Sequence, residues 1–295
     1  MQHYLMLIAA AILLAFEFSM NKLYQRKEGA SAAAGLCFNS VNGLLTAIVF
    51  FFLNGFMNGF SFQLTPFSLL MAACMGIFCF TYNIIGLKMM KEGNMAQYTL
   101  FLMIGGMSIP YVFGIFALNE AFSLLRTLGL ILIFGGVFYA NFQKGQKINR
   151  AYLIMGVIVF CLNGLVSTVS KLHQIESVRP TVSAASFVML AGLIRFFFCG
   201  IAVLLIRNKQ KTLALPHPLA SVLPIILFSA IIGGGSYMLQ LMGAQNLPAT
   251  VLYPCITGGS IVFTTLAARL FFKEKITRQT GIGVLLCFAG MCCFL

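Results

Sequence analysis

The sequence contains no aspartate, and its six acidic residues are all glutamates. Without aspartate the chain can supply neither the Walker B carboxylate of an ATPase nor an aspartyl-phosphate intermediate. A glycine-rich phosphate loop of the Walker A type is absent as well. These absences argue against a pump driven by ATP.

Histidine is also scarce. The three histidines are His3, His173 and His217, and each lies near the end of a predicted helix with no cysteine or histidine at metal-ligand spacing. An enzyme would need an acid or a base beside a nucleophile, and these residues offer little to build one. We therefore expect no metal, no cofactor and no enzymatic activity.

Apolar residues, by contrast, dominate the chain. Hydrophobic residues make up 60% of the 295 positions and charged residues only 8%, so the lipid bilayer is the expected environment. A membrane-spanning helix needs ~20 mostly apolar residues. Ten such segments can be drawn, at about 4–24, 33–54, 66–88, 94–117, 124–142, 151–172, 183–206, 219–243, 248–272 and 279–295.

Basic residues are distributed unevenly over the connections between these segments. Odd-numbered connections carry 15 lysines and arginines, and even-numbered ones carry three. The positive-inside rule then places both termini outside a cell membrane, either a plasma membrane or an inner membrane. The net charge of +13 is explained by these loops, so nucleic acid is not an expected partner.

The stretch 92–137 occurs twice. A shift of 154 residues superimposes Gly105 on Gly259, Glu120 on Glu274, Gly129 on Gly283, Phe134 on Phe288 and Gly136 on Gly290. A repeat of about half the chain predicts two five-helix units, residues 1–145 and residues 146–295. Because five is an odd number, the second unit enters the membrane from the opposite side, which predicts an inverted repeat. Glu120 and Glu274 are expected to be structural corner residues.

Two charged residues lie well inside predicted helices, Glu17 in the first and Arg195 in the seventh. A charge at this depth costs at least ~2.5 kcal/mol on insertion scales, so it must face protein or water. Glu17 shares one helical stripe with Asn21 and Tyr24, which points all three into the bundle.

Each charge has more than one interpretation. Glu17 is either the structural partner of a buried donor or a desolvated carboxylate that binds a proton and a cationic group alternately. Arg195 keeps its charge and needs a counter-anion, either Glu17 or the acidic group of a substrate. Snorkelling of Arg195 toward the membrane surface is the third interpretation, and it also applies to Lys171, one turn inside a helix end.

Uncharged polar residues at helical spacing form stripes on other predicted helices. One such stripe alone is more typical of contacts between helices, whereas several facing inward predict a wet cavity. We therefore predict a substrate or proton site near the membrane midplane, between the first, second, sixth, seventh, eighth and ninth helices. Its residues are Glu17, Asn21, Asn42, Ser170, Lys171, Arg195, Tyr237, Gln240, Tyr253 and Thr257.

Each half closes with a glutamate corner that leads into a glycine-rich last helix. The two motifs are Leu118-Asn119-Glu120 before Gly129 and Gly136, and Phe272-Lys273-Glu274 before Gly283 and Gly290. With ten spans in two repeats, this pattern resembles the drug/metabolite transporter superfamily, in its EamA-like branch. The resemblance implies a secondary transporter with a central cavity that works by alternating access.

The expected function is secondary transport, coupled to an ion or by exchange, of a small polar or zwitterionic metabolite such as an amino-acid-like solute. Glu17 would bind a proton or an amine, and Arg195 a carboxylate or phosphate. The expected partners are the solute, the lipid bilayer and protons as candidate coupling ions.

Two alternatives remain at this point. Within transport, the alternative is an exchanger or flippase for an anionic, sugar-linked substrate such as a sugar phosphate or nucleotide sugar. Outside transport, it is a membrane scaffold or receptor. The sequence leaves the substrate, the direction of flux, the coupling ion and the oligomeric state open.

Overall fold

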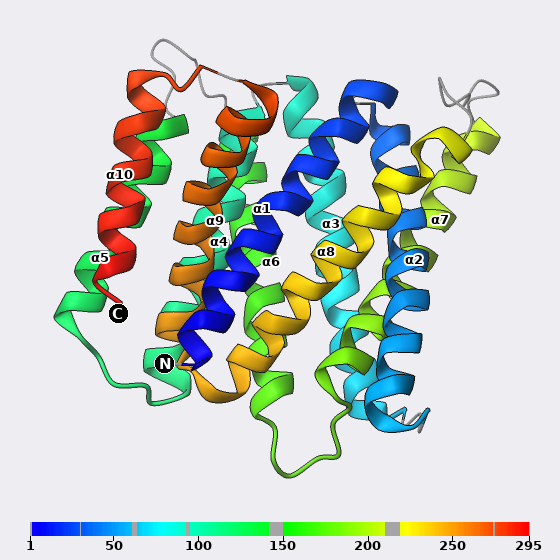
Figure 1. The fold of residues 1–295 in the computed structure, drawn as a ribbon, viewed down its shortest axis with the longest axis horizontal. Coiled ribbons are helices and arrows are strands. Elements are labelled where there is room, and N and C mark those ends of the chain that lie inside the picture. Colours follow the sequence, from blue (N-terminus) through cyan, green and yellow to red (C-terminus); the bar gives the residue numbers. More distant parts are fainter. Residues whose placement is uncertain are drawn as a thin grey trace.

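The chain folds into helices joined by short connections (Figure 1). The computed structural model describes residues 2–29, 31–60, 64–92, 95–141, 150–209, 219–273 and 275–294. In these ranges the helices are α1 (Gln2–Glu28), α2 (Ala32–Asn58), α3 (Pro66–Glu92), α4 (Met95–Ala117), α5 (Leu124–Asn141), α6 (Arg150–Ile175), α7 (Ala184–Lys209), α8 (Leu219–Asn246), α9 (Ala249–Phe272) and α10 (Arg278–Cys292). Each predicted segment therefore corresponds to one helix.

Nine of the described helices are long and apolar enough to cross a membrane. The exception is α10, whose 15 residues extend only ~22 Å at ~1.5 Å per residue. It nevertheless lies alongside α5 at one end of the molecule, while α2 and α7 lie at the other end (Figure 1).

Local signals explain where several helices begin and end. Ser31 and Thr277 precede α2 and α10, and each side chain accepts a 3.1 Å hydrogen bond from the backbone N–H three residues later. After α2 the chain turns at Gly59, whose φ of 66° lies in the left-handed region. Pro248 precedes α9 and caps nothing with its side chain, so the first N–H groups of α9 need a partner from elsewhere.

The glycines of the repeated motif meet in reciprocal pairs between α5 and α10. A β-carbon added at Gly129 would lie 2.7 Å from the carbonyl oxygen of Gly290, and one added at Gly290 would lie 2.7 Å from that of Gly129. Gly136 and Gly283 have the same relationship at 2.6 Å. Residue numbers therefore increase along α5 as they decrease along α10. The two helices match in sequence and are antiparallel in space.

The same reciprocity appears between α2 and α7. A β-carbon at Gly43 would lie 2.7 Å from the carbonyl oxygen of Gly192, and one at Gly192 would lie 2.8 Å from that of Gly43. Three residues further on, Thr46 and Arg195 occupy matching positions across this contact. A pseudo-twofold axis thus passes between Gly43 and Gly192.

The remaining contacts follow the same symmetry. Helix α1 packs on α8 and α9, and its counterpart α6 packs on α3 and α4. The prediction of an all-α membrane protein built from two inverted five-helix repeats is confirmed. The predicted boundary between residues 145 and 146 falls outside the described residues and, like the side of the membrane that the termini face, stays a prediction.

Gly136 should tolerate a side chain far less well than its neighbour Gly135. A β-carbon at Gly136 would meet the backbone of α10, whereas nothing lies within 4 Å of one at Gly135. We expect Gly136→Leu to lower the melting temperature of the detergent-solubilised protein, by a destabilisation of about 1–3 kcal/mol. Gly135→Leu is the matched control, and equal losses in the two variants would contradict the proposed α5–α10 contact.

Candidate substrate site

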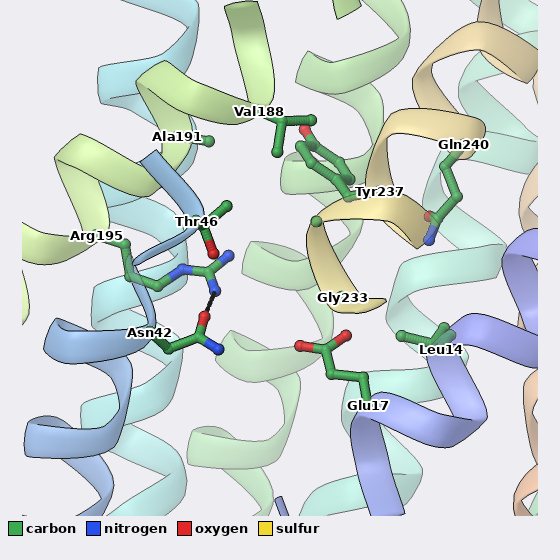
Figure 2. A pocket seen from close by; sticks show the side chains of 11 residues that line it. Leu14, Glu17, Asn42, Thr46, Val188, Ala191, Arg195, Gly233, Tyr237 and Gln240 are labelled. Carbon is green, nitrogen blue, oxygen red and sulfur yellow. Dashed lines mark hydrogen bonds between the residues drawn. The ribbon is translucent and has the colours of Figure 1, made fainter. Parts of the chain in front are cut away.

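A cavity of ≈ 160 Å³ lies between α1, α2, α7 and α8 (Figure 2). Glu17 and Arg195 are the charged residues of its lining, and the other lining residues are uncharged. The lining residues are Leu14, Glu17, Asn42, Thr46, Val188, Ala191, Arg195, Gly233, Gly234, Tyr237 and Gln240. Of the six helices predicted to surround the site, α6 and α9 do not line this cavity.

One wall is formed by α1 and α8 and carries the acid. A β-carbon at Gly233 would lie 2.6 Å from Oε1 of Glu17, so the missing side chain leaves the space that the carboxylate occupies. One turn further along α1, Asn21 Oδ1 accepts a 3.3 Å hydrogen bond from the Ser229 hydroxyl. Asn21 therefore joins α1 to α8 and does not line the cavity.

The opposite wall is formed by α2 and α7 and carries the base. The Arg195 guanidinium donates a 3.1 Å hydrogen bond to Oδ1 of Asn42 (Figure 2). Asn42 is 2% exposed, and its amide nitrogen has no hydrogen-bond partner in the part of the chain that the structure describes. Asn42 thus orients the guanidinium and keeps a free donor.

Glu17 and Arg195 face the same cavity from opposite walls (Figure 2). Among the described residues they form no direct ion pair. Neither group is therefore neutralised by a direct contact with the other. An arrangement of this kind can take a molecule that carries both a cationic and an anionic group.

Several predicted site residues contribute contacts between helices instead. The Ser170 hydroxyl lies 2.8 Å from the hydroxyl of Tyr237, and the Tyr253 hydroxyl donates to the backbone oxygen of Ser167. Thr257 is half-buried on α9 and does not line the cavity. Of this group only Tyr237 reaches the cavity.

Lys171 is 5% exposed, so it is not snorkelling. Its ammonium group donates 2.7 Å hydrogen bonds to the carbonyl oxygens of Ala244 and Leu247, where α8 ends. These carbonyls have no partner within the helix, and the positive charge also complements the helix dipole.

Glu120 completes the same corner from the other side. Its carboxylate accepts hydrogen bonds of 2.6 and 2.9 Å from the N–H groups of Ala249 and Thr250, the first two residues of α9. At the α8–α9 corner, Lys171 therefore places a cation at the C-terminus of α8, and Glu120 places an anion at the N-terminus of α9. Glu274, the predicted counterpart of Glu120, lies outside the described residues.

Six lining residues were missing from the predicted site, namely Leu14, Thr46, Val188, Ala191, Gly233 and Gly234. Thr46 lies one turn after Asn42, so the helical period could have pointed to it. Gly233 has no side chain, and the Glu17 carboxylate occupies the space that this leaves. Only the packing of the two residues reveals this role.

Residues 150–295 match the model of the EamA-like transporter family. The second half of the chain belongs to this family. The resemblance inferred from the glutamate corners and glycine spacing is thereby confirmed, and the protein is a multi-pass membrane protein whose second half matches a transporter family.

A solved structure has a similar fold over nearly the whole chain. That crystal structure of another protein superimposes with a TM-score of 0.72 and covers 99% of this chain and 97% of its own, at 12% sequence identity. At this identity the likeness concerns the fold alone.

Two curated relatives share a shorter stretch with this chain. Both are named probable 4-amino-4-deoxy-L-arabinose-phosphoundecaprenol flippase subunit ArnE. The protein from Enterobacter sp. (strain 638) is 36% identical over 63 residues, which are 21% of this chain. The protein from Sodalis glossinidius (strain morsitans) is 34% identical over 65 residues, which are 22% of this chain. The matches span 58% of each relative.

Lys171→Met and Glu120→Gln should each destabilise the α8–α9 corner. Each substitution removes the charged partner of two backbone groups, at a cost of about 1–3 kcal/mol in the free energy of unfolding. The measurement is the melting temperature in detergent.

Suitable controls lie outside the corner. Lys27 reaches the Ser221 carbonyl oxygen at 3.5 Å in an exposed contact. In an exposed turn, the N–H groups of Val178 and Arg179 bond the Glu176 carboxylate and lower its pKa. Lys27→Met and Glu176→Gln should cost less stability than the corner variants, and equal costs would mean that the corner is not specially stabilised.

Proposed function

We propose that this protein is a secondary transporter that moves a small zwitterionic solute, amino-acid-like in its charges, by alternating access. The observation that carries the proposal is the placement of Glu17 and Arg195 on opposite walls of one cavity without a direct ion pair. The solute's amine would face Glu17 and its acid group would face Arg195.

The size of the cavity supports a small solute. At ≈ 160 Å³ the cavity is smaller than the ~300–1,000 Å³ pockets that hold drug-sized ligands. Val188 and Ala191 give part of the lining an apolar surface, which suits a short hydrocarbon side chain. A large polar head group such as a nucleotide sugar would need a wider cavity than this one.

The environment of Glu17 supports coupling to protons. Burial disfavours an unpaired carboxylate, and either a bound proton or a bound amine removes that penalty. The two ligands compete for one group, so the solute would displace the proton on one side of the membrane and the proton would displace the solute on the other. The inverted repeats supply the two states that such a cycle needs.

Glu17→Gln should abolish uptake driven by a pH gradient, because glutamine cannot exchange a proton. The measurement is uptake of a radiolabelled mixture of the common amino acids into proteoliposomes, with and without an imposed pH gradient. Glu176→Gln, in the loop after α6, is the control and should keep the gradient response. Unchanged gradient-driven uptake in Glu17→Gln would remove Glu17 from the coupling step.

The second candidate function is flipping of a lipid-linked amino sugar, and the ArnE relatives favour it. Their names describe a substrate with an amine on the sugar and a phosphate that links it to undecaprenol. That head group carries the same two charges as the proposed solute. It would place its amine at Glu17 and its phosphate at Arg195, with the lipid tail in the bilayer.

A direct comparison of substrates separates these two functions. Proteoliposomes containing the protein are tested for uptake of the amino-acid mixture and for translocation of a polyprenyl-phosphate amino sugar, which is scored by a membrane-impermeant amine reagent. We expect uptake of soluble amino acids and no acceleration of lipid translocation. The reverse result would establish the flippase, and activity in neither assay would favour a scaffold or receptor.

A further inference from the structure

Asn42 is the buried polar residue at the site whose hydrogen bonding is incomplete. The guanidinium of Arg195 can only donate, so the hydrogen bond at 3.1 Å fixes the amide oxygen of Asn42 toward Arg195. The amide nitrogen must then point away from the guanidinium. Figure 2 shows it on the side of Asn42 that faces Glu17, across the cavity.

This nitrogen is unsatisfied within the protein. It is fully buried and donates to no other atom of the described residues, while the whole side chain is 2% exposed. A buried donor without an acceptor loses its hydration and gains nothing in return. A ligand in the cavity could supply an acceptor, and the resulting hydrogen bond would compensate for the lost hydration of this donor.

The backbone holds Asn42 and Arg195 at a fixed separation. Asn42 directly precedes Gly43, and Arg195 follows Gly192 by three residues. These glycines bring α2 and α7 into backbone contact, so neither helix can shift without breaking that contact. The N–H groups of Arg195 and the N–H₂ group of Asn42 therefore form a preorganised pair of donors on one wall.

We propose that the Asn42 amide and the Arg195 guanidinium together bind one carboxylate of the substrate, which makes Asn42 a specificity-determining residue for acids over their neutral amides. The proposal rests on the proposed function and adds the chemical group that is recognised. A carboxylate can accept from both donors at once, whereas a carboxamide offers one oxygen and brings an N–H₂ group toward groups that only donate. The amine beside that carboxylate would reach Glu17.

The first test uses the wild-type protein and needs no variant to fold. Its melting temperature in detergent is measured with a pool of common amino acids and with a pool of the corresponding amino acid amides. We expect the acids to raise the melting temperature and the amides to leave it nearly unchanged. Equal shifts with both pools would overturn the role of Asn42 while leaving a transporter for amines, and no shift with either pool would overturn the proposed function as well.

The second test changes the donor. Asn42→Asp replaces the free N–H₂ group with an acceptor and pairs with Arg195, so affinity for the acids should fall about ten- to a hundredfold, the range for a lost hydrogen bond to a charged group. Affinity for the amides should fall less. A residue that merely supports the fold would weaken both pools equally, so an unchanged ratio of acid to amide affinity would contradict the proposal.

Asn39→Asp is the matched control for this substitution. Asn39 lies on the same helix three residues earlier, and its amide donates to the carbonyl oxygen of Gly35 at 3.0 Å, away from the cavity. This variant should retain the preference of the wild type for acids. Loss of that preference in both variants would show that a negative charge anywhere on this part of α2 disturbs the site, and the specific role of Asn42 would be rejected.

Discussion

The backbone contact between Gly43 and Gly192 is the constraint on which the cavity depends. It brings α2 and α7 together near the pseudo-twofold axis, and side chains one turn away are thereby directed into the space beside α1 and α8. Larger residues at these positions would separate the helices and move the whole wall. Close approach through small residues is a general device for membrane helices, since lipid supplies no hydrophobic drive for their association.

The charges of the site break the symmetry of the fold that holds them. Arg195 on α7 corresponds to Thr46 on α2, because both stand three residues after the paired glycines. Asn42 precedes Gly43, and its counterpart before Gly192 is Ala191. All four side chains line the cavity. The duplicated backbone therefore offers two equivalent sets of positions, and this sequence places the polar donors unequally between them.

Hydrocarbon supplies no hydrogen-bond partner, so the way in which each buried charge is satisfied separates structure from function. Lys171 and Glu120 each bond two backbone groups of the α8–α9 corner. Glu17 accepts no hydrogen bond from the described residues and instead faces the cavity. A charge that the protein satisfies itself stabilises the fold, whereas one that faces a cavity is available to a proton or a solute.

The sequence predicted the helices, the repeat and the two deeply placed charges, because each of these depends on local composition or spacing. Apolar runs of about 20 residues identify spans whatever their neighbours are. The roles of Lys171 and Tyr253 were different. Their stripes on α6 and α9 looked the same as those that line a cavity, and only contacts with residues more than 70 positions away distinguish them. The space beside Gly233 likewise depends on a distant residue, Glu17, so the sequence around the glycine could not predict it.

Under the proposed function, a bound solute would tie the two walls of the cavity together. Its amine would hold α1 and α8 through Glu17, and its carboxylate would hold α2 and α7 through Arg195 and Asn42. A ligand shifts a conformational equilibrium only by its difference in affinity for the two states. Because the walls belong to packed pairs that each combine one helix from either repeat, bridging them favours the states in which both pairs close on the solute. A solute with only one of the two charges would bind one wall and leave the other free, so the separation of acid and base selects both the substrate and the transition that carries it across.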